Sequence, residues 1–94
     1  MKPSREQETL AMFFAAFSHK RRLMICDILL HHGAKGLSFD ALQARTGIAA
    51  STLSHHLAQM DKGGVLKRKQ KGRATWFAIN LSQFRELPAQ FPTR

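Results

Sequence analysis

The sequence predicts a mainly α-helical domain that carries one small β-hairpin. Apolar residues recur with helical spacing up to Lys62, and the pattern then changes to short runs that favour strands. The chain has 94 residues, which is enough for one domain and too few for two. Hydrophobic residues make up 44% of it, far more than in a disordered basic tail. We therefore expect residues 1–94 to fold as a single domain.

Two helices are expected before Gly33. Within residues 5–17, four apolar side chains follow the i, i+3, i+4, i+7 spacing of an amphipathic helix: Leu10, Phe13, Phe14 and Phe17. Three of them are Phe, which dominates both cores and interfaces, so core packing and contact with a second subunit are equally favoured. A second helix is expected from His19 to His32, with Ser18 as its N-cap and Gly33 at its end.

The next two helices are expected to form a compact pair within residues 38–62. The first runs from Phe39 to Thr46 and is capped by Ser38. The second begins at Ala49 or Ala50, runs to Lys62 and is ended by two glycines. A short helix, a tight turn and a longer helix are the outline of a helix-turn-helix.

The hairpin is expected within residues 65–80. Two strand-like runs flank the turn Gln70-Lys71-Gly72-Arg73, and Trp76 on the second run is expected to pack under the hairpin rather than stack on a base. Six cations fall in twelve residues here, and no acid occurs between Asp61 and Glu86: Lys62, Lys67, Arg68, Lys69, Lys71 and Arg73. Residues 81–94 resume a weak helical pattern that meets Pro88, so any last helix is short.

The charge of the chain limits its partners. Lys and Arg total 15 against six Asp and Glu, for a formal net charge of +9, which favours a polyanion. One cysteine, Cys26, can form neither an intrachain disulfide nor a zinc site of several cysteines, so we expect a cytoplasmic protein. The longest apolar run has eight residues, too few to cross a membrane. We expect no cofactor, no metal and no enzymatic activity, since no catalytic constellation is present.

The helix expected to end at Lys62 has two different faces. On a wheel of about 100° per residue, its apolar side holds Leu53, His56, Leu57 and Met60. The other side holds Ser51, His55, Ala58 and Gln59, and the hydroxyls of Thr52 and Ser54 flank it. These groups suit the base edges of a DNA major groove, and a plain solvated face is the alternative. The unopposed basic hairpin that follows favours DNA, because it can contact the phosphate backbone.

Other polar residues are given structural roles. His56 is expected to pack with a hydrogen bond, and His31 and His32 to complement the C-terminal dipole of their helix rather than bind a metal. His19 has no evident partner. Cys26 is expected to be a small buried residue with a raised thiol pKa, and the alternative is a thiol sensor.

Three segments resemble ArsR-type winged helix-turn-helix repressors. Residues 17–25, FSHKRRLMI, look like the family's L-(A/S)-D-P-T-R-L-x-I, and residues 46–57, TGIAASTLSHHL, are similar to its recognition stretch G-L-S-Q-S-T-V-S-R-H-L. Residues 64–68, GVLKR, and 72–80, GRATWFAIN, resemble its wing, G-L-V-x-x-x-x-x-G-R-x-x-Y-Y-x-L-N. The three matches occur in the family's order, which makes them specific together.

The resemblance implies a homodimeric bacterial repressor that leaves its operator when an inducer, here unknown, binds. It implies about five helices and a two-stranded wing, with residues 1–17 as an N-terminal dimerisation helix. Two-fold symmetry implies double-stranded, pseudo-palindromic operator DNA with half-sites ~34 Å apart. The predicted DNA-binding residues are Ser51, Thr52, Ser54, His55, Gln59, Lys67, Lys69, Lys71 and Arg73. The predicted dimer-interface residues are Leu10, Phe13, Phe14, Phe17, Phe84 and Leu87.

The chain departs from the family pattern in several places. Residues 39–46 hold no Cys and residues 81–94 hold no His or Asp, so the family's usual metal sites are not expected. A dithiol sensor is not expected either, because Cys26 stands alone. Ala49 replaces a capping Ser, at a cost of roughly 1 kcal/mol of helix stability. A module that binds a protein partner through its Phe residues is the alternative function.

Overall fold

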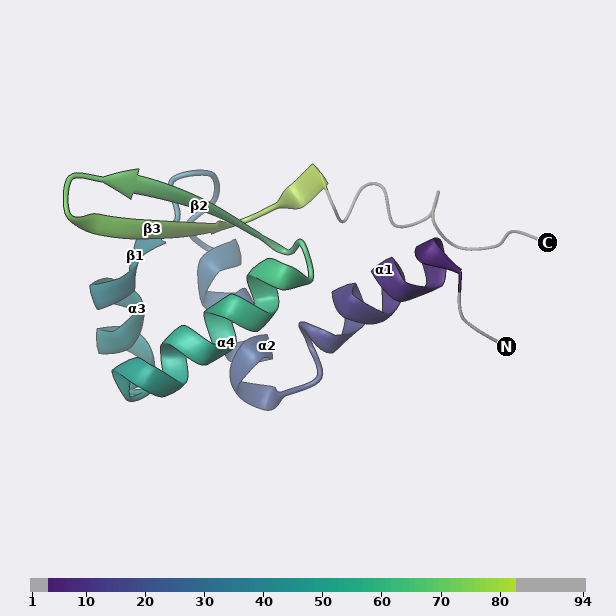
Figure 1. Ribbon diagram of the computed structural model, residues 1–94. Coiled ribbons are helices and arrows are strands. Elements are labelled where there is room, and N and C mark those ends of the chain that lie inside the picture. Colours follow the sequence, from purple (N-terminus) through teal and green to yellow (C-terminus); the bar gives the residue numbers. More distant parts are fainter. Residues whose placement is uncertain (1–3, 83–94) are drawn as a thin grey trace.

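The computed structural model describes residues 4–82, which form four helices and three short strands (Figure 1). One strand lies between the second and third helices, and the other two follow the fourth helix. In chain order the elements are α1 (Arg5–Ala15), α2 (Lys20–Leu30), β1 (Leu37–Ser38), α3 (Phe39–Thr46), α4 (Ala50–Lys62), β2 (Leu66–Lys71) and β3 (Ala74–Ile79). None of these helices has the length and apolar character needed to cross a membrane.

Two predicted features of the architecture are wrong for this part of the chain. The sequence predicts about five helices, but residues 4–82 form four. The predicted C-terminal segment 81–94, which includes Phe84 and Leu87, lies outside the described residues except for positions 81 and 82. The wing has a third strand, because β1 pairs antiparallel with β3 and gives the order β1-β3-β2. A strand of two residues is too short to show the alternation of apolar and polar side chains that marks a strand in a sequence. Only the pairing of Leu37 and Ser38 with β3 defines it.

The helix starts follow local capping chemistry. At α1, the Ser4 hydroxyl accepts the Gln7 backbone N–H at 3.1 Å, and the Gln7 side chain accepts the Ser4 N–H at 2.8 Å, which completes a capping box. Ser38 caps α3 as predicted, by accepting the Ala41 N–H. The predicted N-cap of α2 is wrong, because His19 caps this helix. Ser18 instead donates its hydroxyl to the Ala15 carbonyl at the end of α1.

The core joins every helix to the base of the hairpin. Its largest fully buried side chains come from α1, α2, α3, α4 and the residue before β2: Phe13, Ile25, Leu29, Leu42, Leu53, Met60 and Val65. Two glycines permit close backbone approaches. Gly36, with φ +69°, lies directly against the backbone of Phe77 in β3. A Cβ on Gly63 would lie 2.7 Å from the Met12 carbonyl oxygen and 2.8 Å from Ala16 Cβ, so α1 packs directly on the C-terminal end of α4.

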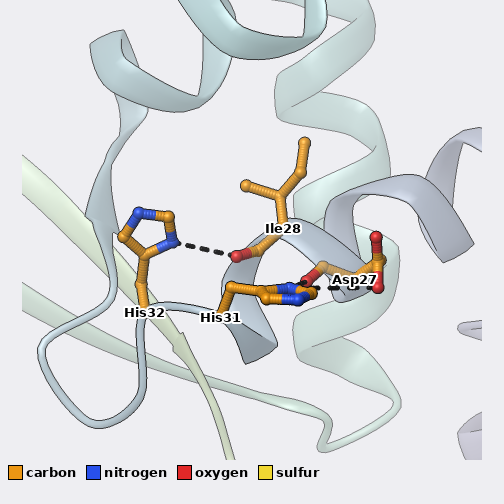
Figure 2. A network of polar contacts seen from close by, with 4 residues as sticks. All are labelled: Asp27, Ile28, His31 and His32. Carbon is orange, nitrogen blue, oxygen red and sulfur yellow. Dashed lines mark hydrogen bonds and ion pairs between the residues drawn. The ribbon is translucent and has the colours of Figure 1, made fainter.

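The C-terminal end of α2 is closed by two imidazoles (Figure 2). His31 Nδ1 lies 2.7 Å from the carbonyl oxygen of Asp27, and His32 Nδ1 lies 3.0 Å from that of Ile28. Carbonyl oxygens only accept, so each ring donates its Nδ1–H to the last turn of the helix. The helix-end role predicted for both histidines is thus a hydrogen-bonding one. Within residues 4–82, no group of three His, Cys, Asp or Glu side chains could hold a metal ion.

Candidate nucleic-acid interface

α4 has the two faces that its sequence predicts. Leu53, His56, Leu57 and Met60 are buried, with exposed fractions between 0% and 4%. The opposite face is exposed and consists of Ser51, Ser54, His55 and Ala58. Thr52 and Gln59 are half-buried along one border of this face. The polar front of α4 is therefore free of contacts that would prevent it from entering a groove.

The first turn of α4 is open for an anion. Ala49 is the N-cap residue and no side chain accepts a hydrogen bond from the N–H groups of the first turn, as the sequence predicts. The first N–H groups of a helix and its positive dipole end favour a phosphate. Ser51 and Thr52 also lie in this turn.

The wing presents cations on both of its faces. In the antiparallel register of β2 and β3, Lys69 lies opposite Trp76, and Arg68 lies opposite Phe77. Because side chains alternate along a strand, Lys67, Lys69 and Lys71 share the outer face with Trp76. Lys71 Nζ lies 4.2 Å from the centre of the half-buried Trp76 ring, a cation–π contact. All the wing cations are exposed.

Arg68 lies on the other face of the wing, the one that faces α4. Its Nε is 3.3 Å from Asp61 Oδ2, which ties β2 to the last turn of α4. A groove of about 430 Å³ lies between α4 and the hairpin and is lined by Ser54, Leu57, Ala58, Thr75 and Phe77, among others. Arg68 is one of the predicted hairpin cations but not one of the predicted DNA-binding residues. The face of the wing on which it lies follows from the pairing of β2 with β3.

A second group of polar side chains lies on the other flank of α4. Arg22 Nε donates to His56 Nδ1 at 3.1 Å, and Arg22 Nη1 donates to the Ala15 carbonyl at 2.9 Å. The His19 ring stacks at a tilt on His56, with 4.6 Å between ring centres, and His55 lies 6.0 Å from it. Burial lowers the pKa of His56, and the neighbouring His19, Arg22, His55 and Arg21 lower it further.

The structure confirms the predicted role of His56 and supplies its partner. A neutral imidazole accepts from Arg22 and packs at 4% exposure. Thirty-four residues separate the two, so no local pattern could have paired them. Cys26 is also buried as predicted, at 7% exposure, and burial, with a smaller effect from Asp27, raises the pKa of its thiol.

The phenylalanines of α1 and of the turn after it divide between the core and the surface. Phe13 is 2% exposed and belongs to the core of its own chain, whereas Phe14 is 48% exposed. Leu10 and Phe17 are half-buried, and Phe17 packs against the core. The Phe13 ring makes edge-to-face contacts with the rings of Phe14 and Phe17 at 5.6 and 5.4 Å. Within the predicted interface set, Phe14 is thus the most exposed aromatic surface among the described residues.

A helix-turn-helix followed by an antiparallel basic wing defines the winged helix-turn-helix class of DNA-binding proteins. A family model described as a helix-turn-helix domain matches residues 17–69. The chain is 33% identical over 72 residues to the HTH-type transcriptional regulator YgaV of Escherichia coli K12, covering 77% of this chain and 71% of that protein. The chain belongs to this helix-turn-helix family.

Solved structures are similar as well. The transcriptional repressor PagR of Bacillus anthracis superposes with a TM-score of 0.67 at 32% identity, over 79% of this chain and 82% of that one. A homodimeric winged helix-turn-helix DNA-binding domain of Mycobacterium bovis, named a possible ArsR-family regulator, gives a TM-score of 0.75 at 23% identity over 95% and 82% of the two chains. The chain is accordingly a DNA-binding transcriptional regulator with a winged helix-turn-helix fold.

Proposed function

We propose that this protein is a homodimeric repressor that binds a pseudo-palindromic operator and leaves it in response to an unidentified signal. The observation that carries the proposal is the exposed polar front of α4 beside a basic wing in which one cation, Arg68, is paired with an acid. PagR is a repressor and the Mycobacterium bovis domain is a homodimer, and both have this fold. A cytoplasmic location, the absence of a cofactor and the absence of catalysis are parts of the same proposal.

In this proposal α4 reads bases and the wing holds the backbone. Ser51, Ser54 and His55 face base edges from the exposed side of α4, and Thr52 and Gln59 contact the border of the groove. The lysines and arginine of the wing neutralise phosphates, which adds affinity without sequence information: Lys67, Lys69, Lys71 and Arg73. In this proposal the helix-turn-helix, residues 38–62, contacts the bases, and the wing, residues 65–80, contacts the phosphate backbone of the same DNA.

The dimer in this proposal forms through residues 1–17 and 81–94. α1 has 11 residues, and Phe13 is the one residue within it that is buried. A helix of this length is marginal alone in water, so its exposed apolar side chains favour a second chain as cover. Phe14, 48% exposed, is the centre of the proposed contact, supported by Leu10 and Phe17 and completed by Phe84 and Leu87. The buried Phe13 takes part indirectly, because it holds Phe14 and Phe17 in place.

The signal is not assigned to Cys26. Thiol reactivity needs the thiolate, and burial keeps this thiol protonated by raising its pKa. Its surroundings favour packing on the core side of α2.

Selection from a random duplex library tests the proposal. Enriched duplexes should be pseudo-palindromes and bind about 10³-fold or more tightly than a scrambled duplex at physiological salt. Reversing charge at Lys69, Lys71 and Arg73 to Glu should abolish this binding, whereas a module for a protein partner would keep its partner. Arg5→Glu on α1 serves as a charge-reversal control, with sedimentation run beside it because α1 is also the proposed dimer helix. Failure of any sequence to be enriched at any salt concentration would refute the repressor function.

A further inference from the structure

The N-terminal turn of α2 concentrates positive charge where a helix tolerates it least. Lys20, Arg21 and Arg22 follow one another after the His19 cap, at the positive end of the helix dipole, and the first turn contains no acidic residue. Two ion pairs occur within residues 4–82, Asp27 with His31 and Asp61 with Arg68, and neither involves this turn. A turn of this composition is destabilised by mutual repulsion until an anion binds.

Two of the four side chains hold the turn in position. His19 Nδ1 accepts the Arg21 backbone N–H at 3.1 Å and caps the helix. Arg22 connects the turn to both of its neighbours, since it donates to the Ala15 carbonyl and to His56 of α4. Lys20 and Arg21 are exposed, and their side chains take no part in these bonds, so their charged groups are available to a ligand.

The turn lies on the flank of α4 that is opposite to the wing. The groove beside the wing is lined by Ser54 and Ala58 of α4. The contact with α2 is made by His56, which lies on the other flank at about 100° per residue, near the border formed by Thr52 and Gln59. Figure 1 shows the hairpin above α4 and the first turn of α2 below it. The polar front of α4 is therefore bordered by cations on both sides.

We propose that Lys20 and Arg21 bind DNA backbone phosphates along the strand that borders the major groove opposite the wing. The proposal rests on the proposed function, because it takes α4 as the helix that enters the groove. A major groove is about 12 Å wide and is bordered by one phosphate backbone on each side. A helix in this groove places its two flanks toward different strands. The wing binds the phosphates of one strand and the first turn of α2 binds those of the other. The two contacts together fix the angle of α4 in the groove.

The salt dependence of binding measures these contacts. Fluorescence anisotropy with a labelled 30-bp random-sequence duplex, between 50 and 300 mM NaCl, gives the slope of log K against log salt. Each lost phosphate contact lowers this slope by about 0.9, so Lys20→Ala with Arg21→Ala should lower it by about 1.8 per subunit. The variant should bind a selected operator and a random duplex more weakly by the same factor, because phosphate contacts carry no base preference. Its thermal stability should equal or exceed that of the wild type, since repulsion is relieved.

A matched control removes one arginine elsewhere. Arg21→Ala alone should lower the slope by about 0.9, whereas Arg5→Ala should leave it unchanged, with sedimentation run beside it because Arg5 lies on the proposed dimer helix. An unchanged slope for the double variant, with a reduced slope for Lys69→Ala with Lys71→Ala, would overturn this inference and leave the repressor function standing. A wild type without sequence preference but with the predicted slope change would refute the repressor function and support the phosphate contact.

Discussion

Gly63→Ala is expected to destabilise the fold by forcing α1 away from α4. Gly63 has φ −76° and ψ −3°, which any residue adopts, so the conformational effect of alanine is a gain of about 0.4–1 kcal/mol through the unfolded chain. The added Cβ would lie 2.7 Å from a backbone oxygen of Met12, which cannot turn aside as a side chain can. Overpacking of this kind costs about 1–3 kcal/mol. The net loss should be about 1–2 kcal/mol, or about 4–8 °C in Tm for each kcal/mol.

Urea denaturation followed by circular dichroism measures this loss, and sedimentation measures the dimer. Because α1 is the proposed dimer helix, Gly63→Ala should also weaken self-association. Ala16→Gly supplies the second corner of a double-mutant cycle, since it removes the Cβ that lies 2.8 Å from the new methyl group. The double variant should be more stable than the sum of the two single effects. A Gly63→Ala protein that melts at or above the wild-type temperature would refute the packing of α1 on α4.

Three further outcomes are expected. Burial lowers the folded-state pKa of His56, so the unfolded chain binds more protons below about pH 6.5 and stability should fall as the pH drops from 7 to 5. His56→Gln should flatten that part of a urea-denaturation profile, and an unchanged slope would contradict the assignment. Cys26 is buried and its thiol pKa is raised, so it should react slowly with a thiol reagent at pH 7.5 until the protein unfolds. The Cys26→Ala protein should bind DNA as tightly as the wild type. Fast labelling of the folded protein would instead support the sensor role. DNA binding should change the fluorescence of Trp76, because a phosphate draws Lys71 from its ring, and Lys71→Met should remove most of that change.

Local patterns in the sequence predicted much of this fold. The helix from Phe39 to Thr46 was predicted with its observed bounds, because Ser38 and Gly47 mark its ends chemically. The two faces of α4 follow from apolar spacing alone, and the basic turn of the hairpin follows from Gly72 between two strand-like runs. Each of these features depends on residues a few positions apart, which is the range over which a sequence pattern can be read.

Features that depend on distant partners were not predicted. β1 exists because Leu37 and Ser38 meet β3 some forty positions later, and the side of the wing on which Arg68 lies depends on the pairing register. Ser18 was predicted to cap α2 because its hydroxyl is a common cap. The turn after α1 extends through Ser18, so His19 is the N-cap of α2. The His19 ring also packs on His56 of α4.

The choice of histidine at position 56 fits a surface that must stay positive. Arg22 needs an acceptor where α2 meets α4, and a carboxylate would bind it more strongly than an imidazole. A carboxylate would also place a negative charge one residue from His55 on the proposed reading face and would repel the phosphates that border the groove. A neutral imidazole satisfies Arg22 without adding charge. His56 is the one buried polar side chain among residues 4–82, and it gives Arg22 of α2 an uncharged acceptor on the proposed recognition helix.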